Sequence, residues 1–331
     1  MTEYILGVDG GNTKTHYALC DTCGNLVNFI RAGTASHENI GYEGMQQELD
    51  KRIHELLSVT GLSAGDICFG VFGLAGADTE KQHAEIGKRI ADIGLKGFKV
   101  CNDAFLGLKA GSKKGYGICS NIGTGTTCGV IDRNGNMLQI GGLGDLSGDD
   151  AGGQFISNKV LRTVYESIYK SGQKTLMKEI LFTILGILDE KILVDAIYEK
   201  VSTGIISRST ISSIAFIAAN KGDAAALELL KQVGRSVAKP VIEAFKRFDF
   251  SGEEEIDILL AGSIYAKGEN PTIIETLKSE LGEKIGIRLR YHLVKEPPVA
   301  GAVLWAYEEL HGVAGEALRK KILHSAQKMA P

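Results

Sequence analysis

The chain has 331 residues, of which 44% are hydrophobic and 23% are charged, and its formal net charge at pH 7 is −3. This composition is that of a globular protein with room for two domains, and the nearly balanced charge gives no electrostatic case for nucleic acid or an anionic membrane as a partner. The longest strongly apolar run, ILFTILGIL at 180–188, is too short to span a bilayer, and no basic stretch followed by an apolar one opens the chain, so we expect a cytoplasmic protein.

The first third of the sequence predicts a mixed α/β unit. Short apolar runs bounded by turn residues predict strands, and longer segments between them predict helices. The predicted strands are 4–9, 15–21, 25–31, 67–76 and 98–103, and the predicted helices are 42–60, 79–93 and one that follows 103 directly.

The rest of the chain predicts a second unit of the same kind that carries a long helical insertion. The insertion covers about 153–247, and after it come a strand at 256–262, a helix after Pro271 and closing helices at 297–328. We therefore expect domains at 1–118 and 119–331, with the final helices free to pack back on the first domain. Because no low-complexity linker separates the two, the boundary depends on an internal repeat.

One phrase occurs twice, as GVDGGNTKTHYALCDTCGNLV at 7–27 and as CSNIGTGTTCGVIDRNGNML at 119–138. Each copy predicts a strand, a tight turn, a strand, a hairpin and a strand. Chance similarity between two hairpins is the plain alternative. Against it, only the first copy keeps a carboxylate at the end of its first strand, since Asp9 is matched by Ser120. Superposed without a gap, the copies pair Thr13 with Thr124, Thr15 with Thr126, Asp21 with Asp132, Gly24 with Gly135 and Asn25 with Asn136.

The Gly/Thr-rich turn in each copy is suited to binding phosphate. Glycine lets backbone N–H groups approach a ligand closely, and a threonine hydroxyl adds a further donor. The sequence contains no G-x-x-x-x-G-K-[ST] run, no complete G-x-G-x-x-G strand-to-helix turn and no H-R-D loop. These absences argue against the P-loop and Rossmann designs, and they leave two phosphate-binding turns that could face each other.

Three motifs resemble, in their order and spacing, the two phosphate motifs and the adenosine motif of the actin, hexokinase and heat-shock ATPase superfamily. They are DGGNTKT at 9–15, IGTGT at 122–126 and LLAGSIYA at 259–266. Within that superfamily, CNDAFLG at 101–107 and GDDAGGQF at 148–155 are similar to the BadF/BadG/BcrA/BcrD ATPase family, which includes N-acetylglucosamine kinase. The resemblance implies two duplicated RNase H-like, actin-like ATPase domains of α/β class that close on a cleft.

The resemblance also implies which residues bind the cofactors ATP and Mg²⁺. Asp9 would hold Mg²⁺ through water, because that ion prefers hard oxygen ligands. The adenosine would lie on Gly262 and Ser263, for which an ordinary strand-to-helix turn is the alternative. The residues implied for the phosphates are Gly10, Gly11, Asn12, Thr13, Lys14, Gly123, Thr124, Gly125 and Thr126.

For the acceptor, the resemblance places Asp103 where the sugar kinases of this group have their catalytic base. Asp103 and Asp149 each precede a predicted helix, so an ordinary helix cap is the alternative for both. Asp150 stands where the family usually has Glu, and Ser36 where its amino-sugar kinases usually have Asn, which leaves the exact sugar open. The residues implied for the substrate are Ser36, His37, Gly76, Asp103, Gly142 and Asp149.

The function implied is an ATP- and Mg²⁺-dependent kinase acting on a small-molecule amino sugar. N-Acetylglucosamine, phosphorylated at its 6-hydroxyl, is the first choice, and N-acetylmuramate and glucosamine are alternatives. A rival is an ATPase that activates an acyl-CoA dehydratase or reductase through a cysteine-held iron–sulfur cluster, although no Cys follows Cys128. A nucleotide-binding regulator without catalysis is a third option. The sequence leaves open a homodimer and the choice between sugar salvage and peptidoglycan recycling.

Overall fold

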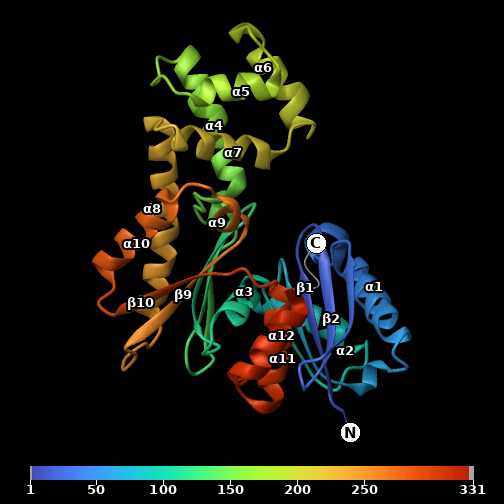
Figure 1. Ribbon diagram of the computed structural model, residues 1–331. Helices are drawn as coiled ribbons and strands as arrows, with labels where there is room; N and C mark the ends of the chain where they lie inside the picture. The colour runs from blue at the N-terminus through green and yellow to red at the C-terminus, as the bar shows by residue number, and fades with distance from the viewer. Residues whose placement is uncertain (1, 328–331) are drawn as a thin grey trace.

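The computed structural model describes residues 2–327 and contains two α/β halves, each built on a five-stranded mixed sheet. In Figure 1 the half with the first sheet lies at the right and the half with the second sheet at the left, and a group of helices stands out above the second sheet. This arrangement confirms the predicted α/β class with two related units.

The first sheet has the strand order β3-β2-β1-β4-β5. Its first three strands form an antiparallel meander, and β4 and β5 are added parallel to β1 on its other side. The strands are β1 (Tyr4–Gly10), β2 (Thr15–Asp21), β3 (Leu26–Ala32), β4 (Ile67–Leu74) and β5 (Phe98–Cys101).

The second sheet has the order β10-β9-β6-β7-β8, which is the order of the first sheet read from the other edge. Here β6, β7 and β8 form the meander, while β9 and β10 are the parallel additions. The strands are β6 (Gly117–Ile122), β7 (Thr126–Ile131), β8 (Met137–Gly141), β9 (Glu255–Ala261) and β10 (Arg288–Leu293). The repeat in the sequence is therefore a repeat of structure.

The two matched hairpins are closed by the same hydrogen bonds. The Asp21 carboxylate accepts the Asn25 N–H at 2.8 Å, and the Asp132 carboxylate accepts the Asn136 N–H at 2.8 Å. The glycine before each asparagine has a positive φ, which a residue with a side chain rarely adopts. Local turn chemistry thus explains why these pairs recur in the sequence.

Helices cover both faces of each sheet. One face of the first sheet packs against α1 (His37–Ser58) and α2 (Glu80–Ala91), and the other packs against α3 (Ala104–Gly111) and α11 (Pro298–His311). No helix within residues 2–327 is long and apolar enough to cross a membrane. The remaining helices are α4 (Gly152–Tyr169), α5 (Met177–Leu185), α6 (Leu193–Ala196), α7 (Arg208–Asn220), α8 (Ala224–Arg247), α9 (Ser263–Lys267), α10 (Thr272–Lys284) and α12 (Glu316–Gln327), with short helical turns at Ala64–Asp66, Gly144–Leu146, Glu190–Ile192 and Ile197–Ser202.

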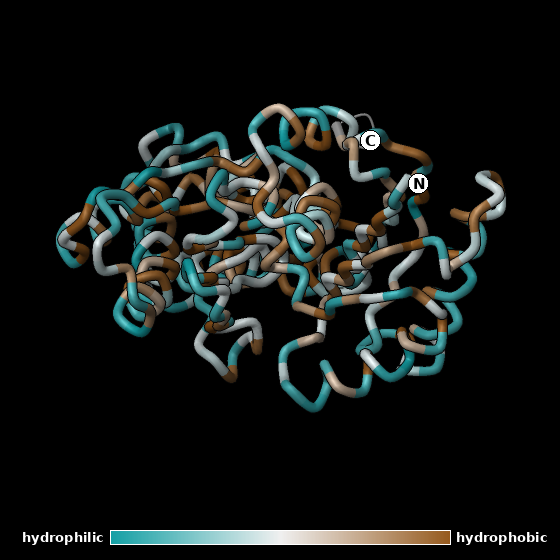
Figure 2. The backbone as a smooth tube through the Cα atoms, turned by 90° about the horizontal axis from the view of Figure 1, so that it is seen from below, coloured by the Kyte–Doolittle hydropathy of each residue, from teal (hydrophilic) through white to brown (hydrophobic). Residues whose placement is uncertain are grey.

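The insertion is helical, as the sequence predicts. Helices α4 to α7 project beyond the second sheet, and α8 returns along that sheet beside α10 (Figure 1). Hydrophobic segments gather towards the interior of the molecule, while many outer loops are hydrophilic (Figure 2).

Helix α11 and helix α3 approach each other closely between the two sheets. A Cβ added at Gly301 would lie 2.0 Å from the Leu106 carbonyl oxygen, and one added at Gly7 on β1 would lie 2.7 Å from Val303 Cγ2. Helix α11 therefore lies directly on the first sheet at Gly7 and directly on α3 at Gly301, at distances that only glycine permits.

The structure differs from the sequence prediction at several boundaries. Strand β10 was not predicted, and α1 begins at residue 37 instead of 42 because a first turn precedes an interruption at Gly41, where φ is 72°. Strand β4 ends at Leu74 instead of residue 76, since Gly76 has a φ of 83° and turns the chain. Strand β5 ends at Cys101, which leaves the next two residues in a loop.

We expect Gly301→Ala to destabilise the protein by roughly 1–3 kcal/mol, because the added methyl group overpacks the contact between α11 and α3. Thermal unfolding followed by circular dichroism measures the effect as a lower Tm. Gly282→Ala is the matched control, since Gly282 lies in α10 with no atom within 4 Å of an added Cβ, and it should raise Tm slightly. Equal shifts for the two variants would contradict the close packing of α11.

Candidate functional site

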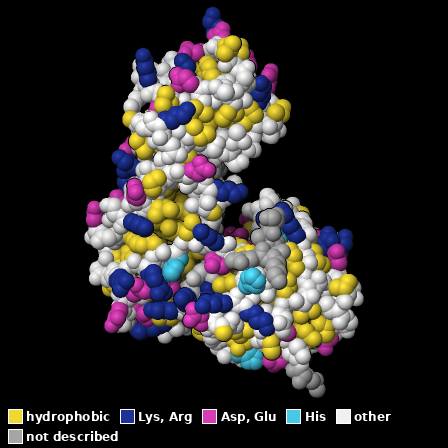
Figure 3. All heavy atoms as spheres, viewed as in Figure 1, with side chains coloured by type: hydrophobic (Ala, Val, Ile, Leu, Met, Phe, Trp, Pro, Cys, Tyr) yellow, Lys and Arg dark blue, Asp and Glu magenta, His cyan; other side chains and the backbone are white. Residues whose placement is uncertain are grey.

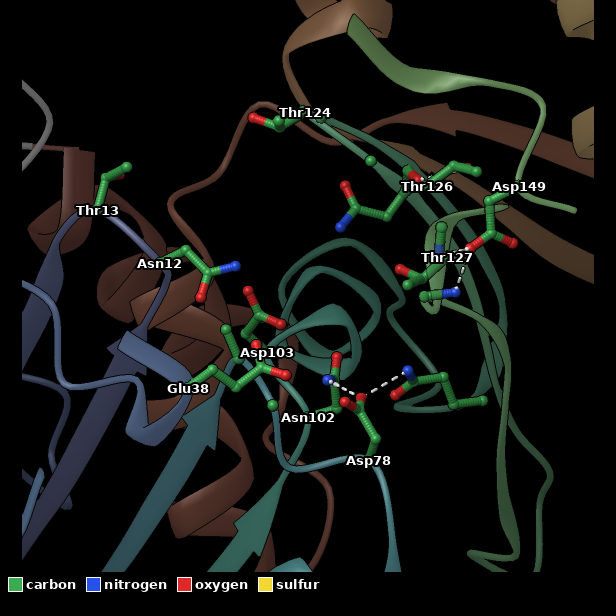
Figure 4. Close-up of a pocket in the computed structure, with 18 residues that line it drawn as sticks. Asn12, Thr13, Glu38, Asp78, Asn102, Asp103, Thr124, Thr126, Thr127 and Asp149 are labelled. Carbon is green, nitrogen blue, oxygen red and sulfur yellow. Dashed lines mark hydrogen bonds between the residues drawn. The ribbon is translucent and has the colours of Figure 1, made fainter. Parts of the chain in front are cut away.

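A cavity of about 320 Å³ lies between the two sheets. Figure 3 shows the surface hollowed between the two halves, and Figure 4 shows side chains from both halves pointing into the cavity. The first half contributes Asn12, Thr13, Glu38, Ala75, Gly76, Asp78, Asn102 and Asp103, and the second contributes Asn121, Gly123–Thr127, Gln139, Gly142, Gly144 and Asp149.

The first Gly/Thr turn joins β1 to β2 at the edge of this cavity. The turn is closed by a hydrogen bond from the Gly11 N–H to the Lys14 carbonyl at 3.0 Å. Asn39, in the first turns of α1, donates its side-chain amide to Asn12 Oδ1 at 3.1 Å. Asn12 and Thr13 line the cavity, whereas Gly10, Gly11 and Lys14 do not.

The second Gly/Thr turn joins β6 to β7 and rests on the start of α4. The N–H groups of Gly153 and Gln154 donate to the carbonyls of Gly123 and Thr124 at 2.8 and 3.0 Å. Gly152 has a φ of 87°, and a Cβ there would lie 2.7 Å from the Thr124 carbonyl oxygen. All predicted phosphate residues of this turn, Gly123, Thr124, Gly125 and Thr126, line the cavity, with Thr13 and Asn12 on the other side (Figure 4).

Asp103 lies in the loop between β5 and α3, at the junction of the two halves. It occupies the N-cap position of α3 but makes no capping hydrogen bond. Its neighbour Asn102 does so instead, because Asn102 Oδ1 accepts the Ala104 N–H at 2.9 Å. The side chain of Asn102, and not that of Asp103, therefore caps α3. The Asp103 carboxyl borders the cavity.

The Asp103 carboxyl has an unusual proton affinity. Burial, followed by the charges of Asp9 and Asp78, raises the pKa of Asp103 to about 7. A carboxyl group with a pKa near neutrality is a stronger proton acceptor than an ordinary carboxylate and is still partly ionised at pH 7. The group is thus suited to general base chemistry.

Asp9 stands near the end of β1, opposite His16 in the register of β1 and β2. Its Oδ2 lies 3.4 Å from His16 Nδ1, and its side chain is 15% exposed. Within residues 2–327 no group of three or more His, Cys, Asp or Glu side chains is arranged to hold a metal. A single carboxylate still fits Mg²⁺, because this ion is usually held by one or two carboxylates together with water and substrate phosphates.

A second cavity, of about 230 Å³, contains the predicted adenosine residues Gly262 and Ser263 together with Asp9, Asp103 and Asn121. Asp103 and Asn121 border both cavities. Gly262 also has a packing role, since its φ is 96° and a Cβ there would lie 2.3 Å from the Ile122 carbonyl oxygen at the end of β6. A strand-to-helix turn at Gly262 is therefore compatible with the predicted adenosine contact there.

Asp149 closes the loop between β8 and α4. Its Oδ2 accepts the N–H groups of Gly142 and Gly144 at 2.8 and 2.9 Å and the Ser147 hydroxyl at 2.7 Å. The N-cap of α4 is Ala151, so neither Asp149 nor Asp150 caps that helix by its side chain. Asp149 lines the cavity with one carboxylate oxygen engaged in holding the loop.

Among the other predicted substrate residues, Gly76 lines the cavity but Ser36 and His37 do not. Ser36 is fully buried and donates to the Ala75 carbonyl at 3.2 Å. The His37 ring stacks on Tyr42 with 4.4 Å between ring centroids. Both residues lie behind the wall of the cavity and support it.

Several polar residues of the cavity were not named individually from the sequence, namely Glu38, Asp78, Asn102, Asn121, Thr127 and Gln139. A signal existed for Asp78 and Asn102, because Asp78 follows the predicted strand 67–76 and Asn102 lies at the end of the predicted strand 98–103, at the same edge of the first sheet as Asp9. Gln139, on β8, gave no signal. Among the described residues 2–327 that line the cavity, none is Lys or Arg, whereas four are carboxylates: Glu38, Asp78, Asp103 and Asp149.

Comparisons with known proteins agree with this architecture. The N-acetylmuramic acid/N-acetylglucosamine kinase of Clostridium acetobutylicum is 28% identical over 247 residues, 73% of this chain and 80% of that protein. The N-acetyl-D-glucosamine kinase of Dictyostelium discoideum is 24% identical over 280 residues, 80% of this chain and 87% of that protein.

Among solved structures, a provisionally named N-acetylglucosamine kinase from Chromobacterium violaceum has the same fold, with a TM-score of 0.65 at 19% identity over 91% of this chain and 98% of that one. A hexokinase of the ROK family from Thermus thermophilus has a TM-score of 0.55 at 18% identity over 93% of this chain and 99% of that one. The family model for the BadF/BadG/BcrA/BcrD ATPases matches residues 6–306, so the chain belongs to the BadF/BadG/BcrA/BcrD ATPase family, as its motifs indicated.

Proposed function

We propose that this chain is an ATP-dependent amino-sugar kinase, with the 6-hydroxyl of N-acetylglucosamine as the favoured acceptor. The observation that carries the proposal is a single cavity in which two Gly/Thr turns meet Asp103, a carboxyl whose pKa is raised to about 7. Membership in an ATPase family and the similarity to amino-sugar kinases support it.

In this proposal the two turns hold the phosphates of ATP and Asp103 accepts a proton from the sugar. The sugar oxygen forms a bond to the γ-phosphorus, the bond from that phosphorus to the oxygen bridging to the β-phosphate breaks, and ADP leaves. Asp103 takes the hydroxyl proton. Mg²⁺, held near Asp9, would neutralise phosphate charge. Backbone N–H groups of the turns and the hydroxyls of Thr13 and Thr124 are the donors proposed for the phosphates.

The charge of the cavity bears on the choice of sugar. Within the part of the chain that the structure describes, four carboxylates and no Lys or Arg line it, so an uncharged sugar meets hydrogen-bond acceptors without electrostatic repulsion. N-Acetylmuramate carries an additional carboxylate, and like charges brought together in a partly buried site are unfavourable. We therefore place N-acetylglucosamine ahead of N-acetylmuramate, with Asp149 and the loop around Gly142 as the proposed contacts to sugar hydroxyls.

Four of the six cysteines are buried and give no support to the partner-activating ATPase. Burial raises the pKa of the thiols of Cys20, Cys101, Cys119 and Cys128, and a thiol must ionise to hold iron. These four side chains are packed in the hydrophobic cores, where they contribute as small apolar groups.

The central test is ADP release by the purified protein with ATP and Mg²⁺. We expect little ADP without sugar, strong stimulation by N-acetylglucosamine, and kcat/KM for N-acetylmuramate at least about tenfold lower. Mass spectrometry of the product identifies the phosphorylated sugar. ADP release at one rate with and without amino sugars, and no sugar phosphate, would rule out the kinase.

Asp103→Asn and Asp9→Asn should impair the enzyme in different ways, because one carboxylate serves the proton and the other the metal. For Asp103→Asn we expect kcat to fall on the order of 10²-fold or more with little change in KM for ATP, and no rescue by added Mg²⁺. Asp9→Asn should raise the Mg²⁺ requirement and recover partly at high Mg²⁺. Steady-state kinetics over a Mg²⁺ series separates the roles, and matching responses would argue against them.

The rate should depend on pH through Asp103. A base must be unprotonated to act, so kcat/KM for the sugar should fall as the pH drops through the pKa of Asp103, which is raised to about 7, and should level off above it. A metal ion at Asp9 cancels one of the charges that raise this pKa, so the midpoint should lie below 7 but above the ordinary carboxyl range. A profile that stays flat down to about pH 5, with activity intact, would exclude Asp103 as the base.

A further inference from the structure

One carboxylate links the two halves across the cavity. Asp78 Oδ1 accepts the side-chain amide of Asn102 at 2.8 Å and the side-chain amide of Gln139 at 2.8 Å, as the dashed lines in Figure 4 mark. Asp78 and Asn102 follow strands β4 and β5 of the first sheet, whereas Gln139 lies on β8 of the second. The contact therefore spans the site itself.

This contact is unlike the other side-chain bonds between the halves. Within residues 2–327, the remaining bonds that join residues up to 118 with later ones involve α11, α12 or the segment just after α3. Those bonds lie around the junction of the halves. Of all the side-chain bonds between the halves within residues 2–327, the bond between Asp78 and Gln139 is the one in which both side chains line the cavity.

The link extends to the proposed base. Asn102 is 4% exposed, and while its amide nitrogen binds Asp78, its Oδ1 accepts the Ala104 N–H at 2.9 Å. Asn102 thus connects Asp78 to Ala104 in the first turn of α3. Asp103 lies between Asn102 and Ala104 in the chain. A buried amide held at both ends has little rotational freedom, so displacing Asp78 displaces the peptide units around Asp103.

The second-sheet end of the link is equally constrained. Gly142 has a φ of 98°, and a Cβ there would lie 2.8 Å from Gln139 Nε2 and 2.8 Å from Thr127 Cγ2. Gln139 is therefore packed beside the loop that Asp149 closes and beside β7, which begins at the second phosphate turn. A shift of the second phosphate turn should therefore also shift Gln139.

We propose that Asp78 is a positioning residue that fixes Asp103 at a set distance from the second phosphate turn, through Asn102 on one side and Gln139 on the other. This rests on the proposed kinase function for its kinetic consequence. Misplacing a reacting group by about 1 Å costs on the order of 10²-fold in rate. The carboxylate is suited to the task because one of its oxygens accepts two amide donors at once.

Because the Gln139 amide donates to the Asp78 carboxylate, the donor and the acceptor can be exchanged between positions 78 and 139 by two substitutions. Gln139→Glu places a second carboxylate against Asp78, removes the donor and introduces repulsion. Asp78→Asn alone keeps an acceptor oxygen for both amides; since it also removes one of the charges that raise the pKa of Asp103, it should be mild when kcat is compared at a pH above that pKa. In the double variant, Asn at position 78 accepts from Asn102 with its oxygen and donates to Glu at position 139 with its nitrogen, so the link is re-formed with its polarity reversed.

The kinetic test compares the two single variants with the double variant. We expect Gln139→Glu to lower kcat on the order of 10²-fold with KM for ATP nearly unchanged, and the double variant to recover to within a few-fold of Asp78→Asn. The control is Gln46→Glu on α1, since Gln46 also donates to an aspartate, Asp92 Oδ2 at 3.1 Å, outside the cavity; it should leave kcat unchanged. A normal rate for Gln139→Glu, or a double variant no better than it, overturns the proposal.

A second readout does not depend on kinase activity. Hydrogen exchange of the backbone amides at 103–106, measured by mass spectrometry, reports how firmly Asn102 holds the start of α3. We expect faster exchange in Gln139→Glu, restored protection in the double variant and equal Tm values within a few degrees. If the wild-type protein phosphorylates no sugar, the kinase proposal fails while exchange still decides the positioning role. Unchanged exchange in Gln139→Glu would overturn that role.

Discussion

The burial of one short helix, α3, between the two sheets is the constraint on which the rest of the structure depends. Its residues from Ala104 to Ala110 are all buried, including Lys109, whose ammonium pairs with Glu308 at 2.5 Å and lies over the ring of Trp305. The glycine at position 301 lets α11 reach the backbone of α3. Because α3 touches both sheets, its first residues are fixed beside the cavity that both Gly/Thr turns border.

A site of this kind concentrates negative charge, and no Lys or Arg among residues 2–327 lines the cavity. Asp103 is surrounded by Asp9 and Asp78, and their charges add to burial in raising its pKa. Neutral donors hold the carboxylates in place, since Asp78 and Asp149 accept hydrogen bonds from amides, backbone N–H groups and a hydroxyl. Such donors hold a carboxylate in place without cancelling its charge. The negative charges that raise the pKa of Asp103 therefore remain.

The sequence predicted most of the fold but only part of the site. The repeat predicted the two meanders, because turn chemistry is local and leaves the same residues in both copies. Strand β10 escaped notice because the polar side chains of Arg288, Arg290 and His292 alternate along it, and no local pattern reveals the carboxylates on β9 that lie beside them. Gln139 escaped for the same reason, since its importance lies in a partner 61 residues away in the chain. Ser36 and His37, by contrast, sit beside the site in sequence yet behind its wall in space.

The return of α11 to the first sheet has a consequence for synthesis on the ribosome. The face of β1 that receives Val303 is complete as soon as the first five strands have emerged, but its cover is encoded about two hundred residues later. At typical elongation rates this leaves an apolar sheet surface uncovered for roughly 10–40 s. A chain truncated before α11 lacks the helix that covers this face of the first sheet, and its exposed apolar surface makes it prone to aggregation.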